Sequence, residues 1–381
     1  MSMKKLSKKM LAVVAAGAMT MGLAMPAFAA DAGEGTKKVT EAYISKTYNT
    51  EVGKAMQFNF TATQDTAGAD LVQKPVACTI PSISFTENET GTTKKVSEAI
   101  KFAPFNEAGK YEYTVKETTS EPAITDSKLE KLIMSKAEYK MTVYVVEDPE
   151  NNFKVDQIVV NKTKNDKGTD EGGKVDISGD ETKNTFNFVN TYVQEAGTGP
   201  DPSKPDPTYN DNGALKVSKT IAAPEGSIDS SATFNFTATF AFPEGTDANT
   251  LGGVKGNEAD VSLTDGTCTF SLKHGQNMKF TGLPVGTKIT VTEKGVANYK
   301  ASASVVLNGG TAKTLTAAKY HVDLTAVNGE KLGQNKNTVD VTNTYNHVPT
   351  TGIIMNTLPY VLMIALCGAA LFGFVAFKRR R

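Results

Sequence analysis

The chain has 381 residues, which is enough for two domains that each bury a core, together with extensions at the ends. Its 41 basic and 41 acidic residues cancel, but eight of the basic ones lie in the first nine and last four residues, which contain no acid. The interior therefore keeps 33 basic residues, all Lys, against 41 acids, which argues against nucleic acid as a partner. Thr, Val, Phe and Tyr are prominent and Trp is absent, so the composition favours strands over helices.

Residues 1–29 have the organisation of a secretory signal peptide. Four Lys precede an apolar run from Met10 to Met25, and the small-residue site Ala27-Phe28-Ala29 follows. We expect cleavage after Ala29 or Ala30. An uncleaved membrane anchor is the alternative, although small residues suit a peptidase better than a lipid boundary.

The interior of the chain contains an internal sequence repeat. The string Phe58 to Thr63 recurs at 234–239, and Val189 to Tyr192 recurs with one change at 342–345. These strings mark the starts and ends of two repeats, residues 37–193 and 213–346. The alternating runs inside them predict strands at 111–117, 140–146, 154–160, 185–192, 288–293 and 339–345. Short strands separated by turn residues are typical of an all-β fold, here two tandem β-sandwich domains.

Two segments depart from this strand pattern. Ser127 to Ser135 is predicted to form a short helix. Residues 194–212 join the repeats, and the alternating prolines from Gly197 to Pro207 favour extended polyproline II geometry. We therefore expect a semi-rigid linker between the two domains.

Strand period two identifies polar residues that share the apolar face of their strands. Glu117, for example, is in phase with Tyr113 and Val115. Each repeat places a Lys in its first strand, a Glu in a middle strand and an Asn in its last strand on such a face. The two trios are Lys46, Glu117 and Asn190, and Lys219, Glu293 and Asn343.

Burying an amine, a carboxyl group and an amide is costly unless they satisfy one another. A buried salt bridge with a hydrogen-bonded Asn is the structural alternative. The chemical alternative begins with desolvation, which lowers the pKa of a Lys and raises that of a Glu, so that the neutral amine becomes a nucleophile. If the amine attacks the Asn amide carbon, the Glu can hydrogen-bond the Asn oxygen and relay a proton to the departing ammonia. The product is an isopeptide bond made once, without turnover.

The end of the chain combines a pentapeptide, an apolar stretch and a basic tail. Residues 358–377 are long enough to span a bilayer, and the basic residues 378–381 would stay in the cytoplasm. The pentapeptide is Val348, Pro349, Thr350, Thr351 and Gly352. This order resembles the cell-wall sorting signal of Gram-positive surface proteins, Leu-Pro-x-Thr-Gly, with Val in place of Leu. The resemblance implies that a sortase thiol attacks the Thr351 carbonyl, releases Gly352 onward and passes the acyl group to an amine.

Together these features resemble the sortase-assembled backbone pilins of Gram-positive bacteria, especially the streptococcal type, whose isopeptide-linkage domains have an immunoglobulin-like (CnaB-type) fold. The family pattern hydrophobic-x-Val-x-Lys matches 215–219 and, more loosely, 42–46. Its Tyr-x-Tyr-x-Val-x-Glu pattern matches 111–117, and 289–293 is the counterpart in the second repeat. The resemblance implies bonds from Lys46 to Asn190 with Glu117, and from Lys219 to Asn343 with Glu293.

Such pilins also use one surface Lys of the first domain as the amine that receives the next subunit. In the streptococcal type it lies seven residues before the closing Asn, which here is Lys183. Lys336 has the same spacing in the second repeat, Lys162 and Lys174 are further alternatives, and the Tyr-Pro-Lys motif of other pilins does not occur in the chain.

The resemblance predicts a structural shaft subunit rather than an enzyme. Its expected partners are sortase, identical subunits, peptidoglycan and accessory pilins, with the membrane before sorting. A wall-anchored adhesin or minor pilin is the second hypothesis, and a surface enzyme is the third. We expect no cofactor or metal, because the three His residues lack metal-ligand spacing.

Overall fold

The computed structural model describes residues 38–65, 75–118, 128–150, 152–223 and 228–346. The chain divides into two compact units, Met1–Val39 and Thr40–Arg381, and only two residues of the first are described. The expected signal peptide, sorting motif, apolar span and basic tail all lie outside the described residues. Within the described ranges, no helix has the length and apolarity that a membrane crossing requires.

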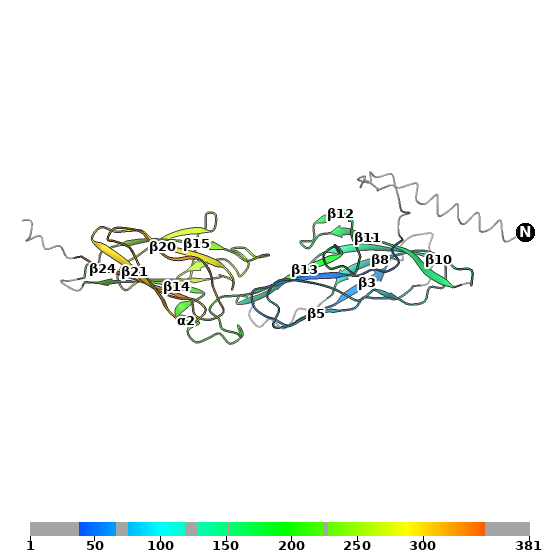
Figure 1. Cartoon of the computed structure of the whole chain (residues 1–381), viewed down its shortest axis with the longest axis horizontal. Coiled ribbons are helices and arrows are strands. Elements are labelled where there is room, and N and C mark those ends of the chain that lie inside the picture. The colour runs from blue at the N-terminus through cyan, green and yellow to red at the C-terminus, as the bar shows by residue number, and fades with distance from the viewer. Residues whose placement is uncertain (1–37, 66–74, 119–127, 151, 224–227, 347–381) are drawn as a thin grey trace, which may run out of the picture. The chain divides into compact units, whose positions relative to one another are not determined.

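Strands make up nearly all of the regular structure, so the all-β expectation is confirmed (Figure 1). Each sheet takes its strands either from the part of the chain that ends at Gln194 or from the part that begins at Leu215. The two parts of the chain therefore form their sheets independently.

The first part forms a four-stranded sheet, a five-stranded sheet and two small ribbons. The four-stranded sheet has the order β6 (Gly91–Val96), β1 (Ser45–Thr50), β13 (Asn187–Gln194), β9 (Glu130–Ile133). The five-stranded sheet has the order β12 (Asp170–Lys174), β11 (Phe153–Lys164), β10 (Glu138–Glu147), β8 (Gly109–Glu117), β3 (Phe60–Gln64). The ribbons pair β2 (Met56–Phe58) with β5 (Ile83–Phe85), and β4 (Cys78–Thr79) with β7 (Lys101–Phe102).

The second part forms a seven-stranded and a four-stranded sheet. The larger has the order β17 (Ala259–Asp260), β16 (Lys255–Gly256), β19 (Asn277–Thr281), β14 (Leu215–Ala222), β24 (Thr338–Tyr345), β21 (Tyr299–Val306), β22 (Lys313–Thr316). The smaller has the order β18 (Thr267–Leu272), β15 (Phe234–Ala241), β20 (Lys288–Glu293), β23 (Leu324–Lys331).

In each part, the strand that carries the predicted Lys pairs in parallel with the strand that carries the predicted Asn. In the first part, β1 pairs with β13 so that Lys46 is opposite Phe188. In the second, β14 pairs with β24 so that Lys219 is opposite Val341. In both cases the predicted Asn lies two residues beyond the residue opposite the Lys. Because side chains two apart share a face, the Lys and the Asn point to the same side of the sheet.

The core-facing phases follow the period-two pattern. Along β8, Tyr111, Tyr113 and Val115 are buried and alternate with more exposed residues. Along β14, Leu215, Val217 and Ile221 are buried on the same face as Lys219. The apolar pattern therefore brings the Lys side chain into the core despite its charge.

The helix predicted from Ser127 to Ser135 is wrong. Ser127 lies outside the described residues, and 130–133 form strand β9, which pairs antiparallel with β13. Glu130 and Leu132 are buried while Lys131 is exposed, a period-two pattern that fits a sheet edge. The buried Glu130 carboxylate accepts a hydrogen bond of 2.5 Å from the hydroxyl of Tyr192 on β13. Tertiary pairing therefore overrides the local helical pattern.

The extended polyproline geometry expected for the linker is also wrong. Asp201 accepts a hydrogen bond from the backbone N–H of Ser203, and Asp206 accepts one from the backbone N–H of Thr208. Each Asp thus closes a turn two residues on, which Asp favours. The segment ends in the short helix α2 (Tyr209–Asn212). The two Asp-Pro-Ser/Thr strings therefore make turns where the proline spacing alone suggests an extended rod.

Candidate functional site

Lys46, Glu117 and Asn190 come together in the core of the first part of the chain. Lys46 extends from β1 and Asn190 from the neighbouring β13, whereas Glu117 is the last residue of β8 in the five-stranded sheet. The side chains of Lys46 and Glu117 are completely buried, and Asn190 is 0% exposed.

Glu117 bridges the other two side chains with its two oxygen atoms. Its Oε2 atom lies 2.7 Å from Lys46 Nζ, and its Oε1 atom accepts a hydrogen bond of 2.7 Å from Asn190 Nδ2. The remaining polar atom of the amide, Asn190 Oδ1, accepts a hydrogen bond of 2.7 Å from the backbone N–H of Ser135. Both polar atoms of the Asn190 amide therefore have a hydrogen-bond partner.

The surroundings of Lys46 make its neutral form more accessible than it is for a Lys in water. Burial lowers the pKa of Lys46 to about 8, although attraction to Glu117 offsets part of the effect. The amine lies 4.4 Å from the centre of the Phe58 ring, which helps to exclude water. This environment makes the amine available as a nucleophile closer to neutral pH than in an exposed Lys.

Lys219, Glu293 and Asn343 form the same constellation in the second part of the chain. Lys219 lies on β14, Asn343 on the parallel strand β24, and Glu293 at the end of β20 in the other sheet. Lys219 Nζ is 3.1 Å from Glu293 Oε1. The same Oε1 atom accepts a hydrogen bond of 2.6 Å from Asn343 Nδ2.

In the second trio, the pKa values of the Lys and the Glu are shifted in the directions that favour a neutral amine and a neutral carboxylic acid. Burial lowers the pKa of Lys219 to about 8, and burial raises the pKa of Glu293. The Lys219 amine lies 4.2 Å from the centre of the Phe234 ring.

One detail of the expected chemistry is different. The sequence-based expectation has the Glu hydrogen-bonding the Asn oxygen, whereas in both trios it bonds the Asn nitrogen. The carboxyl group therefore faces both the attacking amine and the group that would leave as ammonia. Such a position suits a proton shuttle between the two nitrogen atoms better than stabilisation of the oxygen.

Sequence reasoning missed three neighbours of the trios. Phe58 and Phe234 begin the repeated string, so the repetition itself could have indicated a shared role beside the amine. Ser135 could not be found in this way, because its contact with Asn190 is made by a backbone N–H that any residue except Pro carries.

The predicted acceptor amine, Lys183, lies at the surface. Its side chain is 70% exposed and pairs with Asp180 at 3.2 Å. Lys174 and Lys336 are also exposed, whereas the Lys162 side chain is only 21% exposed and pairs with Glu171. Accessibility therefore disfavours Lys162 but does not single out Lys183.

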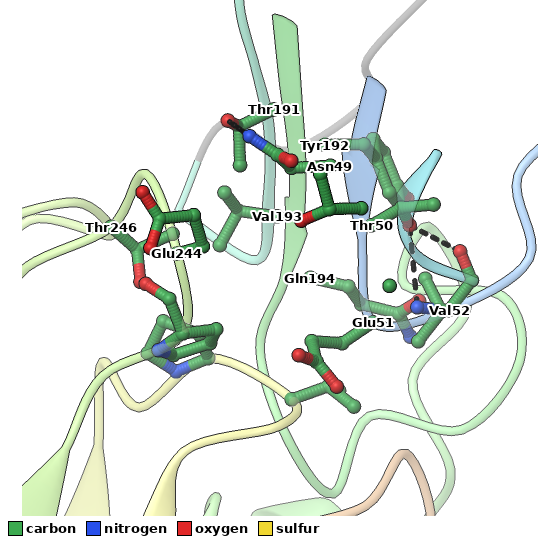
Figure 2. A pocket seen from close by; sticks show the side chains of 15 residues that line it. Asn49, Thr50, Glu51, Val52, Thr191, Tyr192, Val193, Gln194, Glu244 and Thr246 are labelled. Carbon is green, nitrogen blue, oxygen red and sulfur yellow. Dashed lines mark hydrogen bonds between the residues drawn. The ribbon is translucent and has the colours of Figure 1, made fainter. Parts of the chain in front are cut away.

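A separate pocket lies where β1 and β13 end (Figure 2). Asn49 and Thr191 hydrogen-bond each other at its wall, and the Thr50 hydroxyl hydrogen-bonds the backbone of Val52. None of the six trio residues lines this pocket. It is therefore distinct from the candidate site.

Two family models match the chain. Residues 34–193 match the family described as Spy0128-like isopeptide containing domain, and residues 213–345 match a domain of unknown function, DUF7601.

Comparisons with known proteins find similarity to pilus proteins of Streptococcus pyogenes. The chain is 24% identical over 371 residues to a pilin of Streptococcus pyogenes serotype M1, covering 92% of this chain and 95% of the pilin. It is 31% identical over 140 residues to the S. pyogenes pilus tip adhesin Cpa, covering 36% of this chain and 18% of the adhesin. A crystal structure of the S. pyogenes major pilin is 22% identical and covers 81% of this chain and 99% of that one, with a TM-score of 0.32. The family and sequence matches confirm the expected resemblance to streptococcal-type pilins.

Proposed function

We propose that this pilin relative is the shaft subunit of a sortase-assembled, cell-wall-anchored pilus, and that two self-made isopeptide bonds stabilise it. The observation that carries the proposal is the recurrence of one buried Lys-Glu-Asn constellation in both parts of the chain. A single buried trio would suit a salt bridge. Two trios on corresponding strands, with the same offset between the Lys and the Asn, are better explained by a shared reaction.

In the proposed reaction the neutral Lys amine adds to the Asn side-chain carbonyl carbon. The Glu accepts a proton from the Lys nitrogen and delivers a proton to Asn Nδ2, which leaves as ammonia. One C–N bond forms and one breaks, and the Glu ends as it began. The contacts of Glu117 with both nitrogen atoms support this role. The chain modifies itself once and is not an enzyme with turnover.

Polymerisation is the second part of the proposal. Sortase would cleave after Thr351 and pass its acyl group to the Lys183 amine of an identical subunit, and the last subunit would be joined to peptidoglycan. The exposure of Lys183 supports its role as an acceptor. We further propose that 37–193 and 213–346 are immunoglobulin-like domains and that accessory pilins attach to the shaft.

A non-polymerised adhesin or minor pilin is the second candidate, since the match to the tip adhesin Cpa favours it. Immunoblotting cell-wall extracts on a denaturing gel separates the two. A shaft subunit gives a ladder of high-mass species that collapses in a Lys183→Arg strain, with Lys336→Arg as the control. A single band near the mass of the monomer in the parent strain would favour the adhesin instead.

A further inference from the structure

The two trios differ at the oxygen of the amide. In the first, Asn190 Oδ1 accepts the Ser135 backbone N–H at 2.7 Å. In the second, Asn343 Oδ1 is buried and has no hydrogen-bond partner among the described residues. This oxygen receives negative charge when an amine adds to the amide carbon, because the carbonyl π electrons move onto it.

We propose that the Ser135 backbone N–H is the oxyanion donor of the first site and that Asp166 positions it. This inference rests on the proposed isopeptide reaction. When the bond between Lys46 Nζ and Asn190 Cγ forms, the N–H stabilises the charge on Oδ1. The intermediate then collapses, the bond to Nδ2 breaks, and ammonia leaves with the proton that Glu117 relays. A donor already aimed at the oxygen stabilises the transition state without reorganisation.

Asp166 links the segment that carries Ser135 to the strand that carries Asn190. Its Oδ1 atom accepts a 2.6 Å hydrogen bond from the Ser135 hydroxyl and a 2.8 Å hydrogen bond from the backbone N–H of Val189, the residue before Asn190. Its backbone oxygen accepts the N–H of Lys136. The segment between β9 and β10, which carries Ser135, is therefore held against β13, which carries Asn190.

The test is the rate at which each bond forms in newly made full-length chain. The chain is pulse-labelled during cell-free synthesis, chased for increasing times and digested. Mass spectrometry then measures the peptide that joins Lys46 to Asn190, with the peptide that joins Lys219 to Asn343 as an internal standard. If the parent chain forms neither peptide, the proposed reaction itself fails, which differs from a failure of the present inference.

Ser135→Pro removes the N–H and should slow the first bond by about 10²–10³-fold while leaving the second unchanged. Ser135→Ala keeps the N–H and is the matched control, with a much smaller decrease. Formation of the first bond at the parent rate in the Ser135→Pro chain would overturn the inference.

If Ser135→Pro prevents folding, variants of Asp166 test whether the Ser135 N–H stabilises the oxyanion. Asp166→Ala should slow the first bond, and Asp166→Asn, which keeps an acceptor oxygen, should restore most of the rate. A purely structural role would lower the yield of folded chain without this rescue of the rate. Equal rates for Asp166→Ala and the parent would also overturn the inference.

Discussion

At the scale of single residues, the acid–base behaviour of the two buried amines departs far from that of a Lys in water. With a pKa of about 8, roughly one Lys46 side chain in ten is neutral at pH 7. For an ordinary Lys, with a pKa of about 10.4, the neutral share is about one in 2,500. Burial beside an aromatic ring therefore removes much of the cost of preparing the nucleophile.

This shift predicts the pH dependence of bond formation. Because the folded-state pKa of Lys219 is also lowered to about 8, the neutral share should grow about tenfold per pH unit below that value and level off above it. The rates at which both cross-linked peptides appear should therefore rise between pH 6 and 8 and then flatten. A profile that is flat from pH 6 to 8 would show that deprotonation of the amine does not limit the reaction.

At the scale of the strands, the faces of individual elements could be predicted from the sequence, but contacts between distant elements could not. Period two placed Glu117 and Lys219 on buried faces, and both side chains are buried. Strand β9 carries a local helical pattern, but it pairs with β13, and the Tyr192 hydroxyl of that strand donates a hydrogen bond to Glu130. Ser135 lies between β9 and β10, and its contact with Asn190 joins two residues that are 55 positions apart in the sequence. No local pattern of residues records that contact.

The proposed bonds join the first and last strands of each part, and this predicts their effect on stability. Each would close a loop of more than 100 residues, which by analogy with disulfides is worth roughly 5 kcal/mol. Lys46→Ala and Lys219→Ala should each speed digestion by thermolysin at elevated temperature. The matched control is Lys336→Ala, an exposed Lys that should leave digestion unchanged. Equal resistance in all three variants would remove any stabilising role for the bonds.

At the scale of the whole molecule, the proposed polymer would load the two bonds unequally. If Thr351 of one subunit is joined to Lys183 of the next, tension enters the first part seven residues before Asn190, so most of that part lies off the load path. In the second part, tension enters at the start of β14 and leaves at the end of the parallel strand β24. The bond from Lys219 to Asn343 would then bypass the 123 residues between them.

Single-fibre pulling should therefore distinguish the two sites. Without the second bond, released residues extend the chain by about 3.3–3.6 Å each. Glu293→Ala pili should show large unfolding steps and Glu117→Ala pili few. Equal extension in the two variants would mean that the acceptor is not Lys183 or that force follows another path.

The intact mass of the fragment 31–346 shows whether the two isopeptide bonds form. Each bond releases one ammonia, about 17 Da, so the fragment should be about 34 Da lighter than its sequence. Glu117→Gln and Glu293→Gln, which keep the shape of the side chain but cannot relay the proton, should each regain about 17 Da. A parent fragment with the full sequence mass would mean that neither bond forms and that the two trios are buried salt bridges.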